Sequence, residues 1–125
     1  MYGVPAQLDL TAFIGTALTG ISIGQYQIHF LFSSDVGGGD RGITVEGGWE
    51  LRDVESALID KACALDERDV YRIHRLLGRK MTAARVSPPE SFTLVFDNGL
   101  ALTICDDSSE YESCHIFSGT GEVHI

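Results

Sequence analysis

Residues that could bind a metal ion or transfer a proton are few and dispersed along the chain. None of the four histidines stands in the H-x-x-x-H or H-E-x-x-H spacing of zinc-binding helices. A mixed set near the C-terminal end could meet around one loop, but we interpret it as a solvated acidic loop with partly buried thiols. We therefore expect no metal and no cofactor. The residues considered are His29, His74, His115 and His124, and for the mixed set Cys105, Asp106, Asp107, Cys114 and His115.

Signatures of nucleophilic or phosphoryl chemistry are also missing from the sequence. The run Gly37-Gly38-Gly39 is not followed by the Lys-Ser/Thr pair and helix of a phosphate-binding loop. There is no G-x-S-x-G nucleophile elbow. Cys105 and His115 could be a nucleophile and a base, but nothing in their spacing supports that role. The sequence thus favours a protein that is not an enzyme, without deciding the question.

The charge distribution points to a possible kind of partner. The 125-residue chain has a formal net charge of −9, and residues 97–125 contain six carboxylates but no Lys or Arg. Such a balance argues against nucleic-acid binding, which requires cations that neutralise phosphates, and fits a soluble protein or one that meets a basic partner. The predicted partner-binding residues are five near the end of a hairpin and the single tryptophan: Asp106, Asp107, Glu110, Tyr111, Glu112 and Trp49.

The element on which these residues depend is a β-hairpin over 92–104. A three-residue Asp97-Asn98-Gly99 loop pairs Phe96 with Leu100 and places six large apolar side chains on one face. A two-residue Asn98-Gly99 loop would place unlike partners opposite each other, so burial selects the longer loop. That loop requires a residue at positive φ, which Gly99 adopts without steric cost.

Other elements follow from periodicity and end signals. We predict a short helix over 9–15 and strands over 16–23, 25–32, 43–51 and 79–86, the third bulged or broken at Gly47-Gly48. Residues 53–65 have no clean period and are expected to be a loop with one possible turn of helix. The best helix candidate begins at Asp66 and reaches Leu77. If this helix continued through Arg79, it would align four arginines on one face: Arg68, Arg72, Arg75 and Arg79. These arginines could bind an anionic partner, pair with the acidic C-terminal segment or form a solvated face.

Similar patterns recur in the two halves of the sequence. Phe13-Ile14-Gly15 with the strand after it aligns without a gap on Leu76-Leu77-Gly78, at a constant separation of 63 residues. Further along, Phe30 aligns with Phe96, Ile43 with Leu100, and Trp49-Glu50-Leu51 with Tyr111-Glu112-Ser113. We predict an α+β fold: a single domain over 1–125 with two similar halves of about 9–52 and 66–125, mostly antiparallel strands and one principal helix.

Three cysteines without C-x-x-C spacing favour reduced thiols and a cytoplasmic location. The chain shows no apolar run of the roughly 20 residues that a membrane-spanning helix needs, so no membrane partner is expected. Several segments together are distinctive: Met1-Tyr2-Gly3-Val4-Pro5-Ala6, Trp49-Glu50-Leu51-Arg52-Asp53, Ala57-Leu58-Ile59-Asp60, Arg75-Leu76-Leu77-Gly78, the 92–104 hairpin and Tyr111-Glu112-Ser113. With these segments the chain resembles, over nearly its full length, a family of short bacterial proteins of unknown function, many from actinobacteria.

By size, charge and architecture the chain is also similar to the immunity proteins that accompany bacterial toxins. The leading expectation is therefore a non-enzymatic binding protein, with an immunity-type inhibitor of a basic toxin as its specific form. The alternative is a small ligand-binding protein or enzyme with its site between the two halves. That alternative predicts an apolar pocket of roughly 300 Å³ or more, to be sought near His29, His74, Asp106 and His115. A homodimer through an edge strand is a third expectation.

Overall fold

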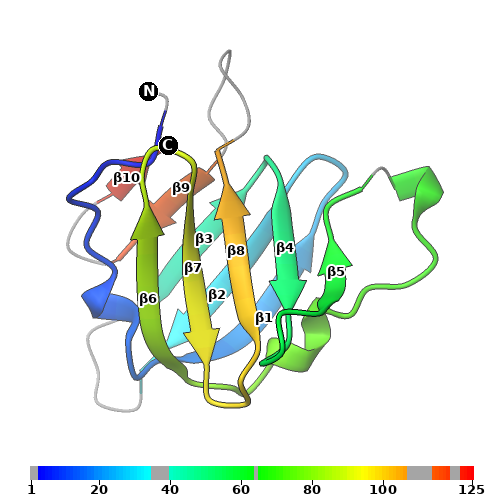
Figure 1. Cartoon of the computed structure of the whole chain (residues 1–125), viewed down its shortest axis with the longest axis horizontal. Helices are drawn as coiled ribbons and strands as arrows, with labels where there is room; N and C mark the ends of the chain where they lie inside the picture. Colours follow the sequence, from blue (N-terminus) through cyan, green and yellow to red (C-terminus); the bar gives the residue numbers. More distant parts are fainter. Residues whose placement is uncertain (1–2, 35–39, 64, 107–113, 119–121) are drawn as a thin grey trace.

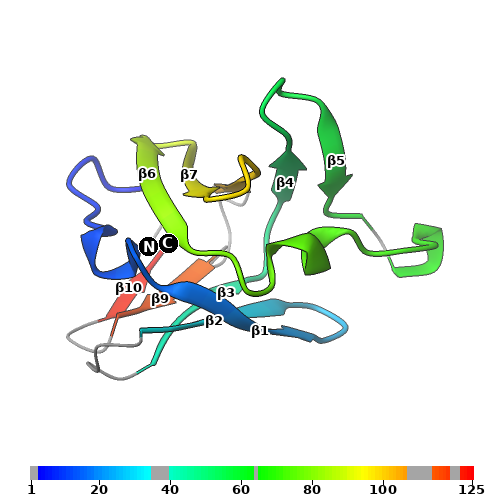
Figure 2. The ribbon, with the colours of Figure 1, turned by 90° about the horizontal axis from the view of Figure 1, so that it is seen from below.

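Two antiparallel β-sheets face each other in the computed structural model, which describes residues 3–34, 40–63, 65–106, 114–118 and 122–125 (Figures 1 and 2). In spatial order, the first sheet contains β1 (Ala17–Ile23), β2 (Ile28–Ser33), β3 (Arg41–Val45), β9 (Cys114–Phe117) and β10 (Glu122–His124). The second contains β5 (Leu58–Lys61), β4 (Trp49–Arg52), β8 (Ala101–Cys105), β7 (Ser91–Phe96) and β6 (Met81–Ser87).

The predicted α+β class is wrong, because the described residues contain no α-helix. Their helical content is limited to three 3₁₀ turns: η1 (Thr11–Phe13), η2 (Leu65–Glu67) and η3 (Ile73–Leu76). The helix predicted over 9–15 shrinks to η1, whose N-cap is Leu10 and has no side-chain capping hydrogen bond. Asp9, the predicted cap, lies one residue earlier and accepts a hydrogen bond from the backbone N–H of Thr11 at 3.0 Å. The molecule is a two-sheet β protein, and among the described residues no helix is long and apolar enough to cross a membrane.

The principal helix predicted over 66–77 is absent for a reason visible in its hydrogen bonds. Asp60 accepts the backbone N–H groups of Arg72 and Ile73, at 2.7 and 3.2 Å, which a helix would direct to its own carbonyls. Two apolar residues of the predicted buried face, Val70 and Leu77, are instead about half exposed. The carboxylate that competes with the helix lies on β5, a strand in the segment predicted to be a loop.

The predicted hairpin register over 92–104 is confirmed. Phe92 pairs with Ile104 and Leu94 with Leu102, and the backbone N–H of Phe96 donates to the carbonyl of Leu100 at 3.0 Å. Gly99 has a φ of +84°, as the three-residue loop requires. All six apolar side chains of the inward face are buried: Phe92, Leu94, Phe96, Leu100, Leu102 and Ile104.

The two halves share a pairing pattern at their first strands. The N–H of Gly15 donates to the carbonyl of Met81 at 2.7 Å, and the N–H of Gly78 donates to that of Leu18 at 2.8 Å. At the separation of 63 residues Gly15 aligns with Gly78, and Leu18 aligns with Met81. Each of the two bonds is therefore the counterpart of the other. Both glycines have positive φ, and both first strands carry an irregularity at the same place, between Leu18 and Gly20 and between Met81 and Ala83. These reciprocal bonds join the two sheets at one edge.

Later parts of the predicted alignment are out of register. Leu18 pairs with Phe32 as Met81 pairs with Phe96, so Phe32, and not Phe30, is the counterpart of Phe96. Ile43 corresponds to Leu102 rather than to Leu100, since Ile43 pairs with Phe30 as Leu102 pairs with Leu94. The shifts of two residues arise because the connecting loops of the halves differ in length, which a two-residue period does not detect.

The fourth and fifth strands of each half cross to the other sheet. The β4–β5 hairpin leaves the first sheet after β3 and pairs with β8, whereas β9–β10 leaves the second sheet after β8 and pairs with β3. Gly47-Gly48, where a bulge or break was expected within one strand, is the point at which the chain changes sheets. The counterpart of Trp49-Glu50-Leu51 is thus Cys114-His115-Ile116, not the predicted 111–113, which lies outside the described residues.

Aromatic side chains join the two sheets in the core. The ring of Phe32 meets that of Phe13 edge-on at 5.3 Å and stacks with that of Phe96 at 6.4 Å. Because Phe32 lies on β2 and Phe96 on β7, this contact spans the layers. These aromatic rings thus pack together between the inward faces of the two sheets.

Candidate functional site

Most of the predicted partner-binding surface cannot be placed: Asp107, Glu110, Tyr111 and Glu112 lie outside the described residues. Asp106 is half-buried and accepts a hydrogen bond from the backbone N–H of Gly3. Trp49 is only 4% exposed, so it is part of the core and not a surface contact. The two described members of the predicted surface therefore have structural partners of their own.

The polar residues expected around a ligand site lie on separate elements. His29 on β2 contacts the Thr44 hydroxyl at 2.8 Å and the Gln27 amide at 2.9 Å. His74 is exposed on η3, with its Nδ1 3.1 Å from the carbonyl of Tyr71. His115 lies on β9. The predicted arginine row does not form either, because Arg68 is buried while Arg72, Arg75 and Arg79 are exposed.

A buried ion pair lies where β5 meets the segment before η3. Arg68 Nη1 donates to Asp60 Oδ1 at 2.8 Å, and both side chains are 6% exposed. The guanidinium also donates to the carbonyl of Lys61 and lies over the ring of Tyr71, 4.0 Å from its centroid, with the Trp49 ring 5.4 Å away. Asp60 receives backbone hydrogen bonds as well, so this buried carboxylate is fully compensated. The pair anchors an otherwise irregular segment.

This environment predicts a pH dependence of stability. Burial of Asp60 opposes its ionisation, but hydrogen bonds from the Arg68 side chain and the Arg72 backbone, with the charge of Arg68, outweigh burial and lower the pKa of Asp60. A lowered folded-state pKa contributes stability that is complete above about pH 5 and is lost as pH falls through the folded value. Urea denaturation between pH 6 and pH 2 should show this loss in the wild-type protein.

The matched variant for that experiment is Asp60→Asn, which cannot ionise. Its unfolding free energy should be lower than that of the wild type at pH 6 and should depend less on pH across the same window. Glu90→Gln, which removes an exposed carboxylate on the turn between β6 and β7, is the control and should keep the wild-type pH slope. Equal pH slopes for the wild type and Asp60→Asn would show that Asp60 does not provide this linkage.

Beside the ion pair lies a hollow of about 260 Å³, which we call the Tyr26 hollow. One wall is the β1–β2 turn, where Tyr26 is 79% exposed, and another is the end of β3 with the exposed carboxylate of Glu46. The remaining wall comes from residues between Trp49 and Tyr71 and includes Arg68. The full lining is Gly24, Gln25, Tyr26, Gln27, Ile28, Val45, Glu46, Gly47, Trp49, Ala62, Cys63, Arg68 and Tyr71.

A second hollow of about 330 Å³ lies along β5 and shares Cys63 and Arg68 with the first. Its lining includes the charged residues Asp60, Lys61, Glu67, Asp69 and Arg72. The Tyr26 hollow is lined by aliphatic side chains such as Ile28 and Val45 together with aromatic, amide and charged groups. Neither hollow is the predominantly apolar pocket of roughly 300 Å³ or more that the small-ligand alternative predicts.

The position that corresponds to the Tyr26 hollow in the other half is filled by the chain itself. There the turn between β6 and β7 contains Pro89, whose carbonyl accepts the backbone N–H of Val4 at 2.9 Å. Val4 is 3% exposed and belongs to the core. Gly3 donates to Asp106, whose counterpart by strand register is Gly47. A two-residue segment, Gly3-Val4, in which Gly3 has a φ of +93°, thus lies against one turn, while the other turn borders a hollow.

Comparisons with known proteins leave the chain without an assigned family: no family model, no curated protein and no solved structure matches it. The functional assignment must therefore rest on the geometry of the chain.

Proposed function

We propose that this chain is a non-enzymatic binding protein that holds a short basic segment of a partner protein in the Tyr26 hollow. The observation that carries the proposal is the occupied counterpart, in which Gly3-Val4 lies against the β6–β7 turn with its N–H groups hydrogen-bonded to Pro89 and Asp106. A foreign segment of the same shape would place one backbone N–H toward a carbonyl of the β1–β2 turn, as Val4 does toward Pro89. This is recognition of a peptide segment partly through its main chain.

The charge of the hollow favours a cationic residue in that segment. Glu46 provides an exposed carboxylate at the rim, and the Tyr26 ring offers a face on which an ammonium or guanidinium can lie. The positive charge of Arg68 is compensated by Asp60 and does not dominate the site. The net charge of −9 would attract a basic partner and speed its association. The specific form of the proposal is an immunity-type inhibitor of a basic toxin.

Two blocked tetrapeptides that copy the chain's own Gly3-Val4-Pro5 segment test the proposal: acetyl-Gly-Val-Pro-Lys-amide and acetyl-Gly-Val-Pro-Glu-amide. Trp49 lines the hollow, so its fluorescence should report binding. We expect the lysine peptide to bind roughly tenfold more tightly than the glutamate peptide, a difference of about 1.4 kcal/mol. The preference arises because the lysine side chain carries a charge opposite to that of Glu46, whereas the glutamate side chain carries the same charge.

Variants of the hollow locate the binding. Glu46→Gln should bring the two peptide affinities together, and Tyr26→Ala should weaken both. Glu55→Gln removes an exposed carboxylate that does not line the hollow, so it should preserve the preference. The proposal is wrong if neither peptide binds, or if Glu55→Gln changes the preference as much as Glu46→Gln does.

A further inference from the structure

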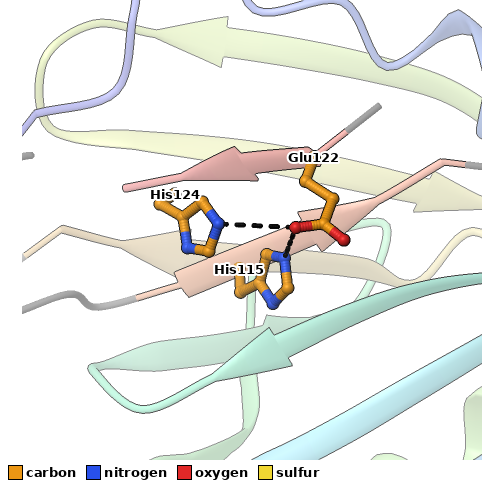
Figure 3. A group of neighbouring side chains, drawn as sticks. All are labelled: His115, Glu122 and His124. Atoms are coloured by element: carbon orange, nitrogen blue, oxygen red, sulfur yellow. Dashed lines mark ion pairs between the residues drawn. The ribbon is translucent and has the colours of Figure 1, made fainter. Parts of the chain in front are cut away.

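We infer a site for a divalent transition-metal ion such as Zn²⁺ on the outer face of the first sheet, formed by His115, Glu122 and His124 (Figure 3). This inference is independent of the Tyr26 hollow. His115 lies on β9 and the other two on β10. His115 and His124 are directly opposite each other in the antiparallel pair, and Glu122 is two residues before His124, so all three side chains leave the same face. A single hairpin therefore presents the whole donor set.

The distances between the donor atoms fit a metal ion. His115 Nε2 lies 3.4 Å and His124 Nε2 3.6 Å from Glu122 Oε2. Zinc–nitrogen and zinc–oxygen bonds of about 2.0–2.2 Å in tetrahedral geometry place neighbouring ligand atoms about 3.3–3.5 Å apart. The donor atoms of all three residues lie within 4.8 Å of one another. The donor atoms therefore already have the spacing of a coordination shell.

A second observation concerns the His115 ring. Its Nε2 is buried and, although it lies 3.4 Å from Glu122 Oε2, makes no hydrogen bond to any described residue. A buried imidazole nitrogen without a hydrogen bond is unfavourable, and a metal ion beside Glu122 would satisfy it. Two imidazoles and one carboxylate are a donor set that suits zinc and other first-row divalent ions. Three protein ligands leave at least one position for water.

Binding requires one change of conformation. The two imidazole rings are stacked, 4.2 Å between centroids and 11° between planes. An imidazole nitrogen directs its lone pair in the ring plane, so two nearly parallel rings cannot both point at one ion. The His124 side chain is 46% exposed, so its ring can rotate. Metal binding should therefore separate the stacked rings, which NMR signals of the histidine side chains would report.

Cobalt substitution and calorimetry test the site. Every protein carries Cys63→Ser, since this exposed thiol could bind metal by itself. We expect one Zn²⁺ per chain by titration calorimetry, and visible Co²⁺ absorption of four- or five-coordinate nitrogen and oxygen ligation. His124→Ala and Glu122→Gln should each lower the affinity for Zn²⁺ at least tenfold.

The matched control is His74→Ala, which removes an exposed histidine outside the cluster. It should bind Zn²⁺ as tightly as the parent protein. The circular dichroism spectrum and the melting temperature without metal should be the same for His124→Ala and the parent. The inference is overturned if His124→Ala, folded by these criteria, retains the parent's affinity, or if no 1:1 binding occurs.

Discussion

Replacing Asp60 by alanine is expected to lower the free energy of unfolding by about 3–5 kcal/mol, because it leaves Arg68 as a buried charge without its counter-ion. The guanidinium side chain is 6% exposed and cannot reach water without disrupting its contacts. Two backbone N–H groups, of Arg72 and Ile73, would lose their acceptor as well. Urea denaturation at pH 7, monitored by Trp49 fluorescence, measures the loss.

The surface pair Glu50–Arg52 gives the matched comparison. Its charged atoms are 2.7 Å apart, as close as those of the buried pair, but its side chains are 37% and 42% exposed. Glu50→Ala should therefore cost no more than about 1 kcal/mol. The double variant Asp60→Leu with Arg68→Met should recover much of the stability lost in Asp60→Ala, since it removes the uncompensated charge. A cost for Asp60→Ala as small as that for Glu50→Ala would contradict the assigned role of the ion pair.

Replacing Gly99 by valine is expected to lower the free energy of unfolding by roughly 2–4 kcal/mol. The positive φ of Gly99 costs a side-chain-bearing residue about 1–2 kcal/mol. An added Cβ would also lie 2.6 Å from Val54 Cγ1, so the neighbouring turn must shift. Thermal and urea denaturation of the variant measure the combined effect.

Gly78 separates the two contributions. It has a similar φ of +81°, but a Cβ there would meet nothing within 4 Å. Gly78→Ala should therefore show the backbone cost alone, and Gly99→Ala should cost more by the clash with Val54. Val54→Ala should relieve part of the excess in the double variant. Equal costs for Gly78→Ala and Gly99→Ala would show that the Val54 contact yields freely.

The hairpin could be predicted from the sequence because its contacts are local. Six apolar residues and one glycine define its register, and each pairs within 13 residues along the chain. The segment 66–77 failed for the opposite reason. Its capping signal and apolar spacing favour a helix locally, but a carboxylate from β5 takes the backbone hydrogen bonds. A tertiary contact of this kind overrides local propensity and leaves no mark on periodicity.

The crossing of strands between the two sheets could not be predicted from the sequence either. β4 and β9 satisfy the same two-residue pattern in either sheet, so the pattern does not choose the neighbour. The histidine cluster was missed because spacing rules for helical metal sites were applied to residues that form a hairpin. His115 and His124, nine residues apart, become direct neighbours once the chain turns between them. Histidines flanking a predicted turn, with a carboxylate two residues from one of them, were the available signal.

The Tyr26 hollow had no local signal, since its walls come from segments up to 47 residues apart, from Gly24 to Tyr71. The hollow is apparent only from the fold, in which the β6–β7 turn is covered by Gly3-Val4 and the corresponding β1–β2 turn is not.

The most direct test of the proposed function is a two-dimensional ¹H–¹⁵N NMR titration of the full chain with acetyl-Gly-Val-Pro-Lys-amide. The shifted amides should be those of the two walls that border the site, residues 24–28 and 45–47, together with the indole N–H of Trp49. The amides near Pro89, where the chain's own segment is bound, should remain unchanged. Shifts confined to other surfaces, or no shifts at millimolar peptide, would contradict the assignment of the Tyr26 hollow as the binding site.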